Sequence, residues 1–455
     1  MRIAWTNLEQ PTEDETVEVR GYPLALGAGR TARNFLILPE PRCCIGHAPA
    51  DPSGAIEVFA ADPIAVRDGM VRLSGRWRIG SDGWRYQLHG ARPMEPPGWR
   101  AVSRRNVLAG GPMMCLAVAA CAASAPETKA AALAALGSGT TVDIHSHAGN
   151  IASMSRMRSG SGFSPIAEPM RQGGMSAICL AIVTDSPTHR VTDGRIRPFR
   201  DPAAGELYHY GTLAFERVHQ LVKQEGLRVV GTAAALTGAA PSVVIAAEGA
   251  DFLEGQIERV EEAHRRWTLR HLQLTHYRVN ELGDIQTEPP VHGGLTDFGA
   301  EVIRRCNRLG IVVDVAHGTL DLVKRAASVT SKPLVLSHTS LAARPGPTSR
   351  QITADHARVV AGTGGVIGVW PVAGIYPNMT AMAVGMARLA DVVGVDHVGL
   401  GTDLRGLTGA STIGDYNELP LLAEALLATG FGSGDVGKIL GGNYVRVFTA
   451  SLAAG

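Results

Sequence analysis

The chain has 455 residues, a formal net charge of +1 and 45% hydrophobic residues. This length exceeds one ordinary domain, and the apolar fraction is sufficient for a large core. The near-neutral charge and an aromatic content of 5% argue against nucleic acid as a partner, because nucleic-acid binding needs basic surface and stacking platforms. The six cysteines show no CxxC spacing, so neither a disulfide framework nor a cysteine metal motif is predicted.

Residues 1–100 predict a small all-β module of unknown function. Short runs of alternating polarity, separated by Gly, Pro and Asp, are typical of strands. These runs lie at residues 16–20, 35–40, 55–60, 70–80 and 84–90. The proline-rich end of the module, residues 91–100, is expected to be a linker.

Residues 101–126 resemble an export signal or a membrane anchor. Arg104 and Arg105 precede an uncharged apolar run at 106–125, which is the layout of a twin-arginine signal. The sequence before Cys121 also resembles a lipoprotein cleavage box, which would place a lipid on Cys121, and the same run is long enough for a single membrane-spanning helix. We therefore expect an exported bacterial protein, periplasmic or membrane-anchored, rather than a cytoplasmic one.

Strand and helix patterns alternate through residues 127–455. The expected strands lie at 140–145, 176–183, 228–236, 242–248, 269–276, 311–317, 334–338, 365–370 and 397–403. Amphipathic helical patterns fill the gaps, for example at 213–224, 252–267, 298–310 and 419–430. Eight or nine mostly parallel strands favour a (β/α)8 barrel of the TIM type over an open doubly wound sheet. No GxGxxG follows the first strand and no GxxxxGK[ST] occurs, so dinucleotide and P-loop sites are not expected.

Metal-binding or acid–base residues end most of these strands. The carboxyl ends of parallel barrel strands meet at one face, where such barrels build their active sites. A hydrolytic metal site needs several imidazoles and carboxylates that converge on a small volume with one position left for water. The residues are His145, His147, Glu248, His276, His317, His338 and Asp403. The sequence therefore predicts a metal-dependent hydrolytic site at this face.

The same part of the chain resembles a known family. Residues 140–450 are similar to the membrane (renal-type) dipeptidases, peptidase family M19, which are zinc peptidases of the amidohydrolase superfamily. The matching stretches are VDIHSH (142–147), IAAEG (245–249), LQLTH (272–276), GLTDFGAEVIRRCNRLGIVVDVAH (294–317), LVLSHTS (334–340), GGVIGVW (364–370), VGLGTD (398–403) and GGNYVRVF (441–448). Residues 1–100 lie outside the resemblance.

The resemblance implies a binuclear site with two divalent metal ions, most commonly Zn2+. His145 and His147 would bind the first ion, and Glu248 would bridge the two. His317 and His338 would bind the second ion. The family has aspartate where this chain has His147, and this departure predicts a more positive site with a more acidic bound water.

The resemblance also implies the roles of three further residues. Asp403 would ligate and deprotonate the bridging water, and His276 would polarise the scissile carbonyl or stabilise the oxyanion. Arg350 would pair with the terminal carboxylate of the substrate, for which a guanidinium fork is suited. Family members have Arg-Asn where this chain has Arg350-Gln351.

Three functional hypotheses follow. The leading one is zinc-dependent hydrolysis of dipeptides by a metal-bridging hydroxide. The second keeps this site but changes the substrate to another small amide, a lactam or an ester, because one fold hosts many substrates. The third is a tethered binding protein without turnover. The resemblance further implies a homodimer.

Overall fold

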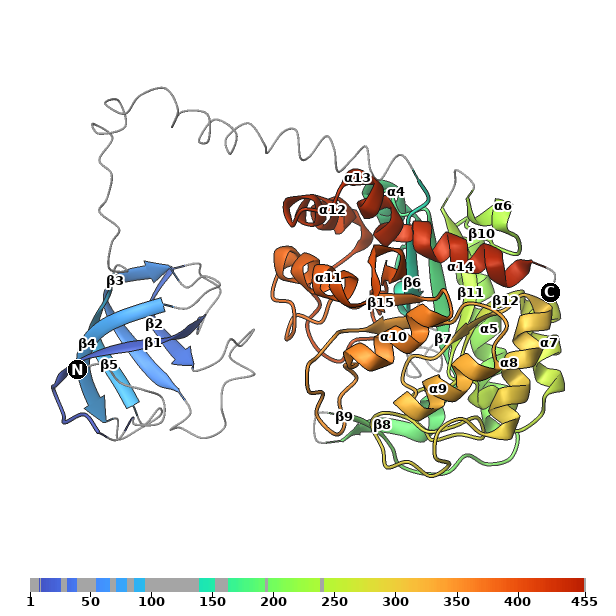
Figure 1. Cartoon of the computed structure of the whole chain (residues 1–455), viewed down its shortest axis with the longest axis horizontal. Helices are drawn as coiled ribbons and strands as arrows, with labels where there is room; N and C mark the ends of the chain where they lie inside the picture. Colours follow the sequence, from blue (N-terminus) through green and yellow to red (C-terminus); the bar gives the residue numbers. More distant parts are fainter. Residues whose placement is uncertain are drawn as a thin grey trace, which may run out of the picture. The chain divides into compact units, whose positions relative to one another are not determined.

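The computed structural model describes residues 8, 10–25, 31–38, 55–65, 71–79, 86–94, 139–151, 163–192, 195–237 and 241–453. The chain divides into two compact units, Met1–Cys121 and Ala122–Gly455, and each is described by itself (Figure 1). The predicted export segment at 101–126, including Cys121, lies outside the described residues.

The first unit is a closed five-stranded β-barrel. Its strands are β1 (Thr16–Ala25), β2 (Thr31–Leu38), β3 (Ile56–Ala65), β4 (Val71–Ile79) and β5 (Tyr86–Pro93). The order around the barrel is β1-β2-β3-β5-β4, with β3 and β5 parallel and the other neighbours antiparallel. This is the order of OB-type barrels. Phe35, Trp77 and Leu88 fill the barrel core with no exposed surface, so the predicted all-β module is confirmed.

The second unit is an eight-stranded parallel barrel. Its strands are β6 (Val142–Ser146), β7 (Ala177–Val183), β11 (Ser242–Glu248), β12 (Leu269–Gln273), β13 (Val312–Asp314), β14 (Val335–Thr339), β15 (Val366–Val369) and β16 (Val398–Leu400). They follow one another in chain order, β16 pairs with β6, and a β7–β11 pairing closes the ring. All residues of these strands except Arg270 of β12 are buried, because the inner face is the barrel interior and the outer face is covered by helices. The (β/α)8 barrel expected from the sequence is confirmed.

The strand predicted at residues 228–236 is mostly absent from the structure. Of residues 228–236, only β10 (Arg228–Val229) pairs, and it attaches to β11 outside the eight-stranded ring. The rest forms α6 (Ala233–Leu236), whose N-cap Thr232 accepts a hydrogen bond from the backbone N–H of Ala235 at 3.2 Å. A threonine cap before an alanine run favours a helical turn over a strand.

Helices surround the barrel (Figure 1). They are α4 (Ala167–Gly173), α5 (Glu206–Gln224), α7 (Glu258–Trp267), α8 (Asp297–Leu309), α9 (Leu320–Val329), α10 (Ala354–Gly362), α11 (Met379–Val393), α12 (Leu419–Ala428), α13 (Ser433–Gly437) and α14 (Asn443–Leu452). Four of them start at a residue whose side chain accepts a backbone N–H of the first turn, as N-caps do: Thr296, Thr319, Thr353 and Asn378. A hairpin of β8 (His189–Thr192) and β9 (Arg195–Pro198) follows β7.

Among the helices of the described residues, none combines the length and the apolar character needed to cross a bilayer.

Candidate metal centre

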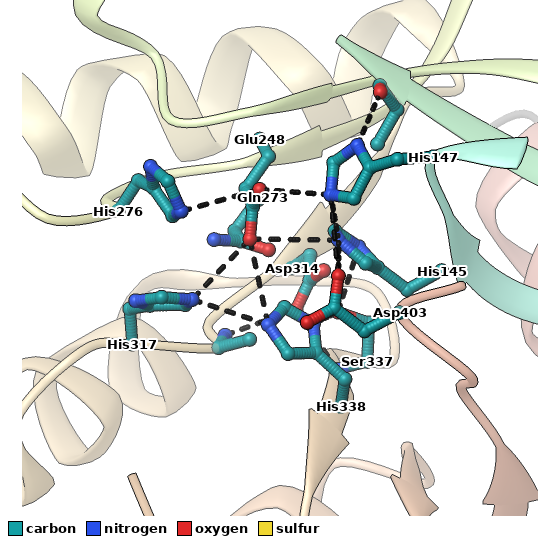
Figure 2. Close-up of polar contacts among 12 residues, drawn as sticks. His145, His147, Glu248, Gln273, His276, Asp314, His317, Ser337, His338 and Asp403 are labelled. Carbon is teal, nitrogen blue, oxygen red and sulfur yellow. Dashed lines mark hydrogen bonds and ion pairs between the residues drawn. The ribbon is translucent and has the colours of Figure 1, made fainter. Parts of the chain in front are cut away.

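The seven residues expected from the strand ends lie together at one end of the barrel (Figure 2). Each is at most 7% exposed. They come from six different strands or the loops that follow them, which explains why they are far apart in sequence: His145 and His147 (β6), Glu248 (β11), His276 (after β12), His317 (after β13), His338 (β14) and Asp403 (after β16).

Glu248 lies at the centre of this cluster. Its Oε1 is 3.4 Å from His145 Nε2, 3.3 Å from His317 Nε2 and 3.4 Å from His338 Nε2. Its Oε2 is 3.1 Å from His147 Nε2 and 3.3 Å from His276 Nε2. Both oxygens of this carboxylate therefore face imidazole nitrogens, an arrangement that suits a divalent metal.

Two of these imidazoles are oriented by contacts on the far side of the ring. His147 Nδ1 donates to the backbone oxygen of Ala181 at 2.8 Å, and His338 Nδ1 lies 2.9 Å from Ser337 Oγ. These contacts direct Nε2 of both rings toward Glu248. Metal-binding histidines are commonly held by such outer contacts.

The arrangement of the imidazoles fits divalent cations. His145 Nε2 and His147 Nε2 are 3.2 Å apart, and His317 Nε2 and His338 Nε2 are 3.1 Å apart. Burial, together with nearby positive charge, lowers the pKa of His317 and His338 well below its usual range, so both rings are neutral and offer lone pairs. Imidazole and carboxylate donors without cysteine suit Zn2+ and similar ions.

His147 differs from the other ligands in its proton affinity. Burial alone would lower its pKa, but the carboxylates of Asp403 and Glu248 raise it to about 10. Its Nε2 lies 3.3 Å from Asp403 Oδ1. A cation that binds here therefore replaces a proton between the same two carboxylates.

Two buried aspartates hold the strand ends in place. Asp143 accepts from the backbone N–H of Thr402 at 2.8 Å and from the Tyr416 hydroxyl at 2.8 Å. Asp314 accepts from the backbone N–H of Ser337 at 3.1 Å. These contacts tie β6 to the loop after β16, and β13 to β14, so both carboxylates support the site without entering it.

His276 is oriented by a residue that the sequence analysis did not select. Its Nδ1 lies 2.7 Å from Asp185 Oδ1, and Asp185 is fully buried. His189 Nε2 of the hairpin lies 3.3 Å from the same oxygen. Asp185 follows the end of β7 by two residues, so it lies at the same face of the barrel although it ends no expected strand.

Some strained backbone lies in the loops of the site. Of the seven described non-glycine residues with positive φ, three lie there: His317 (φ 68°), Asp403 (φ 49°) and Arg405 (φ 70°). Such conformations cost about 1 kcal/mol or more each and are typical of functional loops. A Cβ on the adjacent Gly406 would lie 2.0 Å from Asp403 Oδ1 and 2.4 Å from His147 Cδ2, so only glycine fits there.

A cavity of about 200 Å³ opens above the cluster. Apolar surface comes from Val183, Ile196, Tyr277 and Trp370, and Ile196 belongs to the β8–β9 hairpin. Arg405, which the sequence analysis also missed, lines the cavity as well. The volume suits a ligand of few atoms that is partly enclosed by the hairpin.

Arg350 lies against the cluster and is 8% exposed. Its Nη1 donates to Gln286 Oε1 at 2.6 Å, and its Nη2 donates to His338 Nε2 at 3.0 Å. Burial raises the pKa of the neighbouring Tyr277 phenol to about 12. Tyr277 lines the cavity, and Arg350 does not belong to the described residues that line it.

The family model for membrane dipeptidases (peptidase family M19) matches residues 166–454. The match begins after β6, so His145 and His147 lie outside the matched range. Dipeptidase aclJ of Aspergillus oryzae is 32% identical over 192 residues, which cover 39% of this chain and 44% of that protein. Dipeptidase 3 of Mus musculus is 30% identical over 162 residues, which cover 34% of this chain and 32% of that protein. The chain thus spans about half or less of these two curated relatives.

Solved structures show the same fold. A metallo peptidase from Rhodobacter sphaeroides, liganded with a phosphinate mimic of the dipeptide L-Ala-D-Ala, has a TM-score of 0.58 and 20% identity, covering 69% of this chain and 99% of that one. An amidohydrolase from Pseudomonas aeruginosa has a TM-score of 0.57 and 21% identity, covering 70% of this chain and 98% of that one. Because the family model spans more than half of the sequence, the chain belongs to the membrane dipeptidase family, peptidase family M19.

Proposed function

We propose that this protein is a metal-dependent hydrolase of dipeptides. The observation that supports the proposal best is the convergence of five histidines and two carboxylates on one buried volume beneath a cavity of about 200 Å³. The Rhodobacter sphaeroides neighbour was solved with a mimic of L-Ala-D-Ala. A small amide of that kind is the substrate class proposed here.

We propose two divalent ions, with zinc as the expected metal. When bound, they would polarise the scissile carbonyl and acidify the attacking water. Glu248 would bridge them, because it lies 3.1 Å from His147 Nε2 of the first proposed position and 3.3 Å from His317 Nε2 of the second. The remaining ligands would be His145, His147 and Asp403 for the first ion, and His317 and His338 for the second.

Asp403 would transfer the proton of the reaction, and His276 would stabilise the negative charge that develops. Water adds to the acyl carbon, the C–N bond breaks, and Asp403 would take the proton of the water and deliver it to the leaving amine. His276 Nε2 faces the cluster 3.3 Å from Glu248, where it would stabilise the oxygen that becomes negative. Asp185 would keep the His276 ring in this orientation through the 2.7 Å contact at Nδ1.

The proposal is tested by assaying the zinc-reconstituted full chain against L,L- and L,D-dipeptides, a lactam and an ester, with metal content measured on the same sample. We expect dipeptides to be cleaved most efficiently by protein that holds about two ions per chain. A clear preference for the lactam or the ester would contradict the dipeptidase proposal. It would favour the second hypothesis, in which the same site acts on another small amide, a lactam or an ester. Less than one ion per chain after reconstitution, with no turnover, would favour a binding protein.

Replacing Arg350 with Ala is expected to reduce kcat/KM for dipeptides by about 10²-fold, because a buried guanidinium contributes roughly 2–3 kcal/mol to an anion it binds. The kcat/KM for dipeptides amidated at the C-terminus should fall much less. The control is Arg358→Ala on α10, whose side chain is 58% exposed and pairs with Asp355. An equal loss on free and amidated substrates would show that Arg350 supports His338 rather than binding the carboxylate.

Three expectations stay predictions: export, a membrane tether through residues 106–125 or a lipid on Cys121, and a homodimer. The residues that would anchor the chain lie outside the described part of the structure.

A further inference from the structure

The loop that follows β16 carries an arginine into the wall of the cavity. Arg405 has φ 70°, its side chain is exposed, and it lines the cavity together with Asp403 and His147. The loop is tied to the end of β6 just before this residue, where the N–H of Asp403 donates to His145 O at 2.9 Å and the N–H of His147 donates to Leu404 O at 3.0 Å. The N–H of Gly406 donates to Asp403 O at 2.9 Å and closes a turn around Arg405. The backbone of Arg405 is therefore held in a strained conformation beside the proposed first metal position.

The described cavity wall contains no carboxylate that is free to meet a substrate. Its two acidic residues are Glu248 and Asp403, and both face histidines of the metal centre. Arg405 has no carboxylate or hydrogen-bond partner among the described residues, and the buried Arg350 likewise pairs with no carboxylate there. Bound cations would add further positive charge.

The two guanidinium groups contact different parts of the metal centre. Arg405 lines the cavity together with Asp403 and His147, whereas Arg350 donates to His338 Nε2. Figure 2 shows His147 and Asp403 on one side of Glu248, and His276 and His317 on the other. The cavity wall therefore offers a substrate a second cation besides Arg350.

We propose that the site, besides dipeptides, accepts amides that carry a carboxylate in each half, with Arg405 as the residue that selects the second carboxylate. This inference rests on the proposed amide hydrolysis and extends its substrate class. For N-succinyl-alanine, water would add to the succinyl carbonyl and the C–N bond would break, with the proton passing through Asp403 to the amine of alanine.

The test compares kcat/KM of the zinc-loaded full chain for N-succinyl-alanine, N-acetyl-alanine and Ala-Ala, with L- and D-alanine in the amine half. We expect the wild type to prefer the succinyl over the acetyl substrate by about fivefold or more, which is the size of a partly exposed charge pair. Arg405→Gln should abolish this preference, and Arg405→Glu should shift it toward Ala-Ala. Glycine adopts φ 70° without strain, so Arg405→Gly is the variant to test if the other two fold poorly. The exposed Arg358→Gln is the matched control.

A binding measurement separates this inference from the proposed function. Calorimetric titration of N-succinyl-alanine into zinc-loaded Asp403→Asn protein, with and without Arg405→Gln, reports recognition without turnover. Weaker binding by about fivefold in the double variant supports the inference even if no amide is hydrolysed, in which case only the proposed function fails. Equal binding, or a succinyl-to-acetyl ratio that Arg405→Gln leaves unchanged, would overturn it.

Discussion

Replacing Asp403 with Asn is expected to lower kcat for dipeptides by about 10³-fold while the metal content stays close to that of the wild type. The amide keeps one oxygen at the position of the ligand atom but cannot accept the proton of the attacking water. Asn also tolerates the left-handed backbone of this residue, φ 49°, so the loop should keep its conformation. Steady-state kinetics and elemental analysis of the same preparation measure both quantities.

The matched control for Asp403→Asn is Asp355→Asn on α10, where the side chain is 79% exposed and far from the proposed chemistry. It should leave kcat and metal content unchanged. Near-normal turnover of Asp403→Asn would remove Asp403 from the proton transfer. Loss of both turnover and metal would assign Asp403 to metal binding alone.

Replacing Glu248 with Gln is expected to have the second large effect, on metal binding itself. Glu248 lies within 3.4 Å of five imidazole nitrogens, more than any other side chain among the described residues, so its charge serves both proposed metal positions. Neutralising it should weaken zinc binding by at least about 10²-fold, since outer-shell changes alone cost up to this much. Activity should fall with the metal.

Zinc retained during dialysis against a competing chelator, measured per chain, checks this expectation. Glu168→Gln on α4 is the control, with a side chain that is 58% exposed. Circular dichroism shows whether the variant is folded. A folded Glu248→Gln protein that keeps two ions as tightly as the wild type would exclude a bridging carboxylate at this position.

Much of the barrel could be predicted because its strands are short, β-branched and apolar, and they recur between amphipathic helices. Eight of the nine expected strands form the ring. The exception, residues 228–236, contains valines followed by an alanine run, and local hydrophobicity does not distinguish a strand from a short buried helix there. Thr232 decided the outcome by capping a helical turn.

The metal-binding residues were predictable for a different reason. A parallel barrel brings every strand's carboxyl end to one face, so a histidine or carboxylate at such an end is placed near the others without knowledge of the side-chain geometry. Asp185 obeys the same rule but follows its strand by two residues and ends no expected strand, so it was missed. Arg405 gave no such signal, because an arginine in a loop is ordinarily solvated.

The sequence by itself determined the strand–helix order and the seven residues that meet at the barrel end, because those depend on periodicity and on which residue ends each strand, and its motifs indicated the family by resemblance. Only the tertiary structure decided which atoms face one another: that Glu248 lies between the imidazoles, that Asp185 orients His276, and that Arg350 lies beside the cavity while Arg405 lines it. Those relations depend on loop conformation and on contacts between residues as far apart as His147 and Asp403. Local sequence patterns carry no information about such contacts.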